Sequence, residues 1–329
     1  MTSIMPTHNL GQLIKSINSH SSFLLSAHVS PEGDCVASLI AMDSLLQKIR
    51  KKSFILCEDP VPLQLSFLDN GRWHTLKSGN ESPDFDAGII VDCPTLDRIG
   101  RVQDVIRSKK TFTINIDHHV SNRSFGDVNF VDVHAAACGE LIYALFKELK
   151  IPLSEEDCRA IYVSISTDTG SFRYSNTSAK THEIVADLMR HGLNIEQINE
   201  SLYENIPKRK VDLFKIFLNR IEFNDEMKSA CAILKEGDFE KEGASKTDLE
   251  GFVEYLRSIH GVEVAFFITE QEGDSRVSFR SKGHFDVNLL AGHFGGGGHK
   301  KASGCTIHEA PELAKKKILD QIRVQRKGN

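Results

Sequence analysis

The sequence predicts a two-domain α/β protein, in which a parallel-sheet N-terminal domain is joined by helices to a smaller mixed α/β C-terminal domain. The chain has 329 residues, more than one small hydrophobic core usually organises. In the first half, short continuous apolar segments alternate with helical patterns, which is typical of parallel strands covered on both faces. Toward the C-terminus, a hairpin pattern lies among amphipathic helices, which indicates a mixed sheet.

Apolar runs of strand length give the N-terminal domain its expected sheet. The expected strands are residues 22–27, 53–57, 87–91 and 111–116. A helix is expected from Cys35 to about Lys48, between the first two strands. From Ala137 to Phe223 apolar residues recur three and four positions apart, as in GELIYALFKELK and DLFKIFLNRIEF, and this spacing predicts helices throughout that stretch.

The pattern changes again after Asp225. We expect a strand at 229–237, a helix at 245–258, a hairpin at 261–282 that turns at Glu272-Gly273-Asp274, and a last helix from about Pro311 to Arg326. The basic residues that end the last helix suit a solvated helix C-terminus. These patterns predict domains at 1–190 and 226–329, with a helical linker at 191–225.

Composition restricts the classes of function. No apolar run approaches the roughly 20 residues that span a bilayer, and the N-terminus lacks the pattern of a secretory signal. The seven cysteines are scattered and form no CxxC pair, so we expect reduced thiols in the cytoplasm. Because no apolar run is long enough to span a bilayer, we expect no membrane partner. A formal net charge of −5 gives no general attraction to nucleic acid, so a polyanion needs a local patch or metal ions.

Ionisable residues follow three of the predicted strands. One such residue at a strand end is usually a turn former, but a set at three strand ends favours a shared site. Because parallel strands present their carboxyl ends at one edge of a sheet, we expect these side chains to lie close together. The residues are His28, Glu32 and Asp34 after the first strand, Asp92 after the third, and Asp117, His118 and His119 after the fourth.

This mixture of histidines and carboxylates without thiolate suits divalent ions such as Mn, Mg, Fe or Zn. Converging carboxylates repel one another unless cations neutralise them. Adjacent His118 and His119 point to opposite sides of an extended chain, so one could bind metal while the other faces substrate. Asp168 is expected near a helix C-terminus, where a metal would compensate its charge; a local hydrogen bond in a turn is the alternative.

The segment AGHFGGGGHKKASG, residues 291–304, predicts an anion site in the C-terminal domain. Apolar patterns flank its glycines, which favours a folded loop over a flexible linker. Glycine allows positive φ and a close approach of backbone N–H groups to an anion. His299, Lys300 and Lys301 add positive charge, and Arg280 in FRSK has the planar guanidinium that suits phosphate. Phe294 is a candidate for stacking on a base.

Six segments, in order along nearly the whole chain, resemble the motifs of a known family. HVSPEGD at 28–34, IIVDC around Asp92, DHH at 117–119 and STDTG around Asp168 resemble the four motifs of the DHH phosphoesterases. FRSK and GGGGH resemble the DHH-associated C-terminal domain. The compact architecture is most similar to the nanoRNase/pAp-phosphatase branch, because the DNA exonucleases usually carry extra domains and the pyrophosphatases have a different second domain.

The resemblance implies two divalent metal ions, typically Mn²⁺, with Mg²⁺, Co²⁺ or Zn²⁺ as alternatives. One ion would be held by His28, Glu32 and Asp92, and the other by Asp34, Asp92, His118 and Asp168, so that Asp92 bridges. Glu32 stands where the family usually has Asp, and Ala37 where it commonly has Gly. Catalytic roles are implied for Asp92, for Asp117, which would orient a histidine, and for His119, which would contact the scissile phosphate. Substrate would be bound by His119, Arg280, Ser281, Gly296, Gly297, Gly298 and His299.

The implied activity is hydrolysis of short oligoribonucleotides to mononucleotides, and of 3′-phosphoadenosine 5′-phosphate to AMP, by a hydroxide that two metals activate. The expected partner is therefore short single-stranded RNA or a small bisphosphorylated nucleotide, and a homodimer is left open. Two alternatives remain. One is a phosphodiesterase for cyclic dinucleotides or their linear products, which the same motifs could support. The other, motivated by Glu32, is a nucleotide- or RNA-binding protein without catalysis.

Overall fold

The computed structural model describes residues 7–76 and 84–327. The chain divides into two compact units, Met1–Asn205 and Ile206–Asn329, and each has its own sheet and its own core. The expected class, an α/β protein with one parallel sheet and a second mixed sheet, is confirmed. The boundaries expected at 1–190, 191–225 and 226–329 stay a prediction.

The sheet of the N-terminal unit has six parallel strands in the order β3-β2-β1-β4-β5-β6. The strands are β1 (Ser22–Ser26), β2 (Lys52–Cys57), β3 (Trp73–Thr75), β4 (Ala87–Val91), β5 (Phe112–Asp117) and β6 (Val128–Val131). All four strands expected from apolar runs are present, whereas the short β3 and β6 were missed. The order reverses between β1 and β4, and such a switch point is where open α/β sheets place their ligands.

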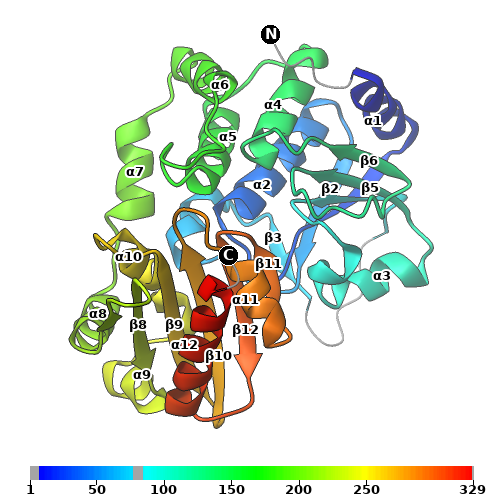
Figure 1. Cartoon of the computed structure of the whole chain (residues 1–329). Helices are drawn as coiled ribbons and strands as arrows, with labels where there is room; N and C mark the ends of the chain where they lie inside the picture. The colour runs from blue at the N-terminus through cyan, green and yellow to red at the C-terminus, as the bar shows by residue number, and fades with distance from the viewer. Residues whose placement is uncertain (1–6, 77–83, 328–329) are drawn as a thin grey trace. The chain divides into compact units, whose positions relative to one another are not determined.

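Helices cover both faces of this sheet. They are α1 (Thr7–Ser19), α2 (Gly33–Lys48), α3 (Val102–Ser108), α4 (Cys138–Glu148), α5 (Glu155–Asp168), α6 (Ala179–Arg190) and α7 (Ile195–Tyr203). Alternate strand residues enter two cores, as the two-residue period of a strand requires. Leu24 and Ile90 pack with α3, while Leu25 and Ile89 pack in the core that contains α1, α2, α4 and α5. Figure 1 shows α2, α4 and α5 side by side.

Helix α5 begins and ends where its sequence dictates. The hydroxyl of Ser154 accepts from the backbone N–H of Asp157, and the carboxylate of Asp157 accepts from the backbone N–H of Ser154. This reciprocal pair satisfies N–H groups that the first helical turn leaves unpaired. The helix ends at Asp168, so the expectation of an acid at a helix C-terminus is confirmed.

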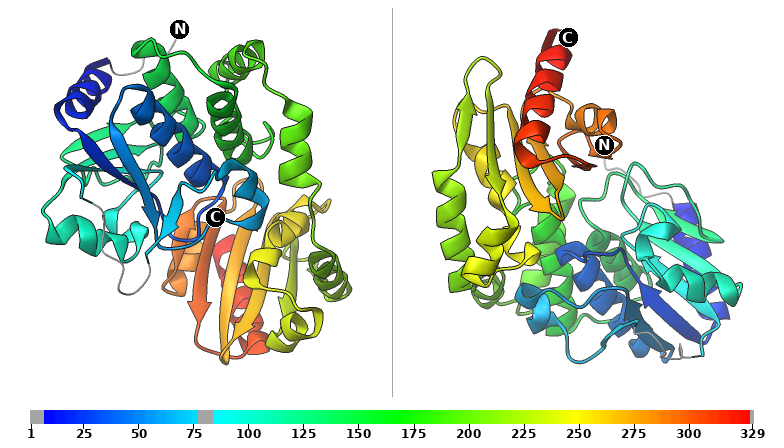
Figure 2. Two further views of the ribbon diagram at one scale, coloured as in Figure 1. Left: turned by 180° about the vertical axis from the view of Figure 1, so that it is seen from behind. Right: turned by 90° about the horizontal axis from the view of Figure 1, so that it is seen from below.

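The C-terminal unit has a mixed sheet in the order β11-β12-β10-β9-β8-β7, in which only the β8–β9 pair is parallel. Helices α8 and α10 pack on one face and α11 and α12 on the other, as Figure 2 shows from two further sides. Its elements are α8 (Lys208–Asn219), β7 (Glu222–Asn224), β8 (Ser229–Leu234), α9 (Glu236–Glu242), α10 (Phe252–Ser258), β9 (Val264–Gln271), β10 (Asp274–Ser281), α11 (Val287–His293), β11 (Gly297–His299), β12 (Ala302–Ile307) and α12 (Pro311–Lys327).

Two expectations for this unit are confirmed. The β9–β10 hairpin turns at Glu272 and Gly273, whose φ angles of +50° and +84° are those of a tight hairpin turn. The glycine-rich segment is a folded element, because β11 pairs with β12 within it. The carbonyl oxygen of Gly304 would lie 2.1 Å from a Cβ at Gly296, so a larger residue does not fit there.

Two other expectations were wrong in detail. The helical pattern that was expected to continue to Phe223 ends at Asn219, and residues 222–224 form the edge strand β7 instead. Apolar spacing over so few residues does not distinguish a last helical turn from a short strand, and pairing with β8 decides it. The helix expected at 245–258 is split: a 3-10 turn ends at Leu249, and Gly251, with a φ of +91°, precedes α10.

The described helices include none with the length and apolarity that a membrane span requires. All seven cysteines are buried and none forms a disulfide. The cytoplasmic location expected from the scattered cysteines stays a prediction.

Gly298 permits the close contact of β11 with β12. Replacing Gly298 with a larger residue tests whether this contact exists as described. The φ of Gly298 is +144°, and a Cβ there would lie 2.7 Å from the carbonyl oxygen of Ala302. We expect Gly298→Ala to open this strand pair at a cost of about 1–3 kcal/mol, which would appear as faster amide exchange at residues 297–304. The control is Gly292→Ala in α11, where a Cβ meets nothing within 4 Å. Unchanged exchange in Gly298→Ala would contradict this account.

Candidate active site

The expected site residues of the N-terminal unit gather at the carboxyl edge of the parallel sheet, around the switch point between β1 and β4. His28 follows β1, Asp92 follows β4, and His118 follows β5. Two helices supply the remaining acids: Asp34 lies in the first turn of α2, and Asp168 is the last residue of α5. Residues far apart in sequence therefore meet because parallel strands end at one edge.

Asp92 lies between two histidines, each of which faces a different oxygen of its carboxylate. Nε2 of His28 is 3.5 Å from Oδ2, and Nε2 of His118 is 3.5 Å from Oδ1. Asp92 is 2% exposed and has a φ of +57°, a left-handed conformation that is uncommon outside glycine but tolerated by aspartate. Nδ1 of His119 also lies 3.5 Å from Oδ1, so both oxygens of Asp92 face imidazole nitrogens.

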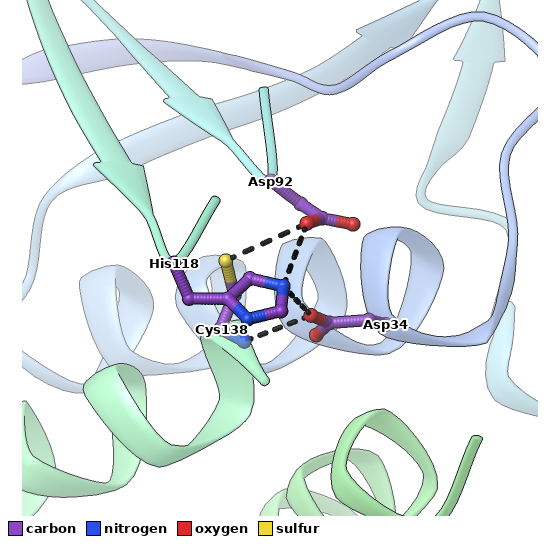
Figure 3. Close-up of side chains that lie close together, drawn as sticks. All are labelled: Asp34, Asp92, His118 and Cys138. Carbon is purple, nitrogen blue, oxygen red and sulfur yellow. Dashed lines mark hydrogen bonds and ion pairs between the residues drawn. The ribbon is translucent and has the colours of Figure 1, made fainter. Parts of the chain in front are cut away.

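Three carboxylates surround Nε2 of His118. Besides Asp92, the Oδ2 atom of Asp34 lies at 3.5 Å and the Oδ2 atom of Asp168 at 3.7 Å. Figure 3 shows Asp34 and Asp92 converging on the imidazole from α2 and from the end of β4. Asp34 and Asp92 are buried, whereas the side chain of Asp168 is 31% exposed, so this position opens to solvent on the Asp168 side.

Hydrogen bonds fix the carboxylate of Asp34. Its Oδ1 accepts from the hydroxyls of Ser38 at 2.8 Å and Ser164 at 2.6 Å, and its Oδ2 accepts from the backbone N–H of Cys138 at 2.8 Å. The sequence interpretation missed these three residues. Ser38 lies four residues after Asp34 and Ser164 four before Asp168, a helical spacing that puts each on the same face as its acid. Cys138 does not follow a predicted strand, so no sequence pattern marked it as a site residue.

Backbone carbonyls orient the two histidines that face Asp92. Nδ1 of His28 is 2.8 Å from the carbonyl oxygen of Val29, and Nδ1 of His118 is 3.3 Å from that of Ala135. A carbonyl oxygen only accepts, so each Nδ1 carries the hydrogen. In the neutral ring, Nε2 then has its lone pair directed toward the carboxylates, as a metal-binding histidine requires.

Asp117 orients His119 rather than His118. Its Oδ1 lies 2.7 Å from Nδ1 of His119, and its Oδ2 accepts from the amide of Asn122 at 2.5 Å. Asp117 is fully buried, while the side chain of His119 is 22% exposed. The sequence did not indicate which histidine Asp117 would orient, and it did not predict that Asn122 contacts Asp117.

Burial and close charged neighbours shift the pKa values of the ionisable groups in this site. Burial, and then the charge of a neighbouring aspartate, raises the pKa of Asp34 to about 6 and that of Asp168 to about 8. Burial also opposes ionisation of Asp92, but hydrogen bonds from His118 and His28 hold its pKa below the usual range. Burial disfavours the charged histidines, yet the hydrogen bond to Asp92 and the neighbouring negative charges together raise the pKa to about 9 for His28 and about 10 for His118.

These carboxylates are close together and largely buried, which is the arrangement that divalent cations stabilise. The oxygen and imidazole donors suit hard or borderline ions. The residues present therefore fit a metal centre. Glu32 lies at its rim, with Oε1 3.9 Å from Nε2 of His28 and a side chain that is 71% exposed.

In the C-terminal unit, the candidate substrate-binding residues occupy β10, β11 and the turns around them. Nε of Arg280 donates to Oε1 of Glu254 at 2.8 Å. Ser281 is buried, and its hydroxyl donates to the carbonyl oxygen of Phe285 at 2.8 Å. Gly297, Gly298 and His299 form the exposed edge strand β11, and Gly296 precedes it. Phe294 packs against the core beside α11.

Each of the two units matches the model of a known protein family. Residues 22–165 match the DHH family, N-terminal domain, and residues 226–324 match the DHHA1 domain. The bifunctional oligoribonuclease and PAP phosphatase NrnA of Bacillus subtilis is 28% identical over 306 residues, which cover 92% of this chain and 94% of that protein.

Two solved structures share the fold. An exopolyphosphatase-related protein from Bacteroides fragilis has a TM-score of 0.91 at 24% identity, over 98% of this chain and 97% of that one. RecJ in complex with Mn²⁺ from Thermus thermophilus has a TM-score of 0.54 at 11% identity, over 96% of this chain and 54% of that one.

Fold, site and comparisons together define a two-domain phosphoester hydrolase, as the sequence predicted. With the DHH domain followed by the DHHA1 domain along most of its length, the chain belongs to the DHH family of phosphoesterases.

Gly33 controls the distance between the helices that carry Asp34 and Asp168. A Cβ at Gly33 would lie 2.3 Å from Oγ1 and 2.6 Å from Cβ of Thr167, a short side chain that cannot swing aside. We therefore expect Gly33→Ala to separate α2 from α5 and to lower the free energy of unfolding by about 1–3 kcal/mol in denaturant titrations. Adding Thr167→Ala should recover part of this loss.

The control for this effect is Gly11→Ala in α1, where a Cβ meets nothing within 4 Å. If Gly33→Ala proved as stable as Gly11→Ala, the tight contact between α2 and α5 would not exist as described.

Proposed function

We propose that this protein hydrolyses short oligoribonucleotides to mononucleotides and 3′-phosphoadenosine 5′-phosphate to AMP, with two divalent cations bound on either side of Asp92. The observation that carries the proposal is the position of Asp92, whose two oxygens face His28 and His118 separately. The substrate class comes from the name of the B. subtilis relative, an oligoribonuclease and PAP phosphatase that matches 92% of this chain.

The two proposed cation positions share Asp92. His28 would complete the first position together with Glu32, whose exposed carboxylate would have to turn inward from the rim. Asp34, His118 and Asp168 would complete the second. Bound there, two divalent cations would activate water and offset negative charge at phosphorus. Manganese, the ion in the RecJ structure described above and the one that the sequence resemblance implies, is the first candidate, and Mg²⁺, Co²⁺ and Zn²⁺ are the alternatives.

His119 is proposed to contact the scissile phosphate. Its Nδ1 is engaged by the buried carboxylate of Asp117, which fixes the ring and supports a positive charge on it. Burial lowers the pKa of His119, but the hydrogen bond to Asp117 and the charges of Asp92 and Asp117 together raise it above its usual value. A charged imidazole held in place can donate to a phosphate oxygen as negative charge develops there.

The C-terminal unit is proposed to bind a second phosphate of the substrate. In this structure Arg280 forms an ion pair with Glu254. When substrate binds, the guanidinium could release that carboxylate and contact a phosphate instead through two parallel hydrogen bonds. His299 and the backbone N–H groups of Gly297 and Gly298 would supply further donors. The N–H of Gly296 donates to the carbonyl oxygen of Ala291 at 2.9 Å, so Gly296 would shape the loop instead. The hydroxyl of Ser281 is committed to a backbone carbonyl, so Ser281 would act by shaping the adjacent loop. A second phosphate anchor favours short substrates.

A cytoplasmic location is part of this proposal, since buried thiols without disulfides need no oxidising compartment. Association into a homodimer stays open to measurement by sedimentation.

The proposal is tested by incubating the protein with Mn²⁺ and three separate substrates: a 5′-labelled RNA trinucleotide, 3′-phosphoadenosine 5′-phosphate and a cyclic dinucleotide. We expect the first two to be hydrolysed and the reaction to stop when EDTA removes the metal. Asp34→Asn should retain its fold by circular dichroism but lose activity, because one carboxylate of the second position would be replaced by a neutral amide.

The other outcomes discriminate among the remaining functions. Turnover of the cyclic dinucleotide alone would identify a phosphodiesterase for cyclic dinucleotides. Binding of the trinucleotide without hydrolysis, with Mn²⁺, Mg²⁺, Co²⁺ and Zn²⁺ each tried, would identify an RNA-binding protein. Full activity in Asp34→Asn would remove Asp34 from the metal centre.

Arg280 gives an independent test of the second phosphate site. Arg280→Ala should raise KM for 3′-phosphoadenosine 5′-phosphate by about 10–100-fold with a smaller change in kcat, because a hydrogen bond to a charged group contributes about 1.5–3 kcal/mol. The control is Arg276→Ala, four residues earlier on the same face of β10 and exposed. Equal KM values in the two variants would exclude a special role for Arg280.

A further inference from the structure

A sulfur atom completes a four-donor cluster at the second cation position. Cys138 is the first residue of α4 and is fully buried. Its Sγ lies 3.8 Å from Oδ1 of Asp92, and one donor atom from each of Asp34, Asp92, His118 and Cys138 lies within 4.8 Å of the other three. Figure 3 shows these four side chains converging from the end of β4, the end of β5, α2 and α4.

Three of the distances between these donors are those of a tetrahedral metal site. With metal–ligand lengths of about 2.0–2.3 Å for oxygen, nitrogen and sulfur, the edges of such a tetrahedron measure about 3.3–3.8 Å. The distance from Nε2 of His118 is 3.5 Å to Oδ2 of Asp34 and 3.5 Å to Oδ1 of Asp92. The 3.8 Å from Sγ of Cys138 to the same oxygen of Asp92 is a suitable sulfur-to-oxygen edge.

Two residues therefore compete to be the fourth ligand. Asp168 approaches Nε2 of His118 at 3.7 Å from the partly exposed side and offers oxygen, which suits Mn²⁺ or Mg²⁺. Cys138 approaches from the buried side and offers sulfur, which suits Zn²⁺, Cd²⁺ or Co²⁺. The choice of fourth ligand would then depend on the softness of the cation.

We propose that Cys138 is an alternative ligand at the second cation position, so that a thiophilic divalent cation binds there through sulfur in place of Asp168. The inference rests on the metal centre of the proposed function but on no particular substrate. Binding forms one S–metal bond and releases the S–H proton to solvent, with no change of oxidation state. With Cys138 as the fourth ligand, Zn²⁺ would have a ligand set of the kind found in structural zinc sites.

Cobalt absorption tests the inference without any enzyme assay. The full-length protein titrated with Co²⁺ should show a sulfur-to-cobalt charge-transfer band in the near ultraviolet and the intense visible absorption of tetrahedral cobalt. Cys138→Ser should lack the charge-transfer band and bind Zn²⁺ at least about tenfold more weakly in calorimetry, since even outer-shell changes cost 10–100-fold. Cys158→Ala, another buried cysteine of the same unit, is the matched control and should keep the band.

A second variant covers the case in which Cys138→Ser fails to fold. Asp168→Asn should retain the band, because the sulfur mode does not use Asp168. A wild-type protein that binds Co²⁺ without the band, a band that persists in Cys138→Ser, or a band lost in Asp168→Asn would each overturn the inference. If the protein hydrolyses the trinucleotide but shows no charge-transfer band, only the inference about Cys138 is contradicted. If it shows the band but hydrolyses no trinucleotide, only the proposed substrates are contradicted.

Discussion

Two buried carboxylates, those of Asp34 and Asp92, lie 3.5 Å from one imidazole nitrogen, and the N-terminal unit is organised to keep them there. Burial, and then the charge of Asp92, raises the pKa of Asp34, while two histidines hold the pKa of Asp92 below its usual range. Such a cluster persists only where the fold fixes each group independently. It is also the environment in which divalent cations bind most favourably.

The parallel sheet and the helices packed on it hold Asp34 and Asp92 in place independently of each other. Asp92 is set by the end of β4 and its left-handed backbone, whereas Asp34 is set by α2 and by hydroxyls that reach it from α2 and α5. The contact of Gly33 with Thr167 brings these two helices together. The geometry of the candidate site thus depends on how α2 packs against α5 at the residues next to Asp34 and Asp168. In the C-terminal unit, Gly298 of β11 has a comparable structural reason, because the neighbouring backbone of Ala302 and Ser303 leaves no room for a side chain.

The sequence predicted those features that local pattern determines. Continuous apolar runs identified β1, β2, β4 and β5, and ionisable residues at the ends of three of them identified the site. The short β3 and β6 were missed because three or four residues carry too little pattern, and β7 because apolar spacing continued beyond α8. Contacts that tertiary packing creates were also missed. Cys138 reaches Asp92 only because α4 begins beside β5, and the turn after Asp117 determines that it holds His119.

The central claim is that Asp92 bridges two cations, and anomalous diffraction from crystals grown with Mn²⁺ tests it most directly. The account predicts two anomalous peaks, one within coordination distance of His28 and Asp92 and the other within coordination distance of Asp34, Asp92 and His118. A single peak, or two peaks that do not share Asp92, would contradict it.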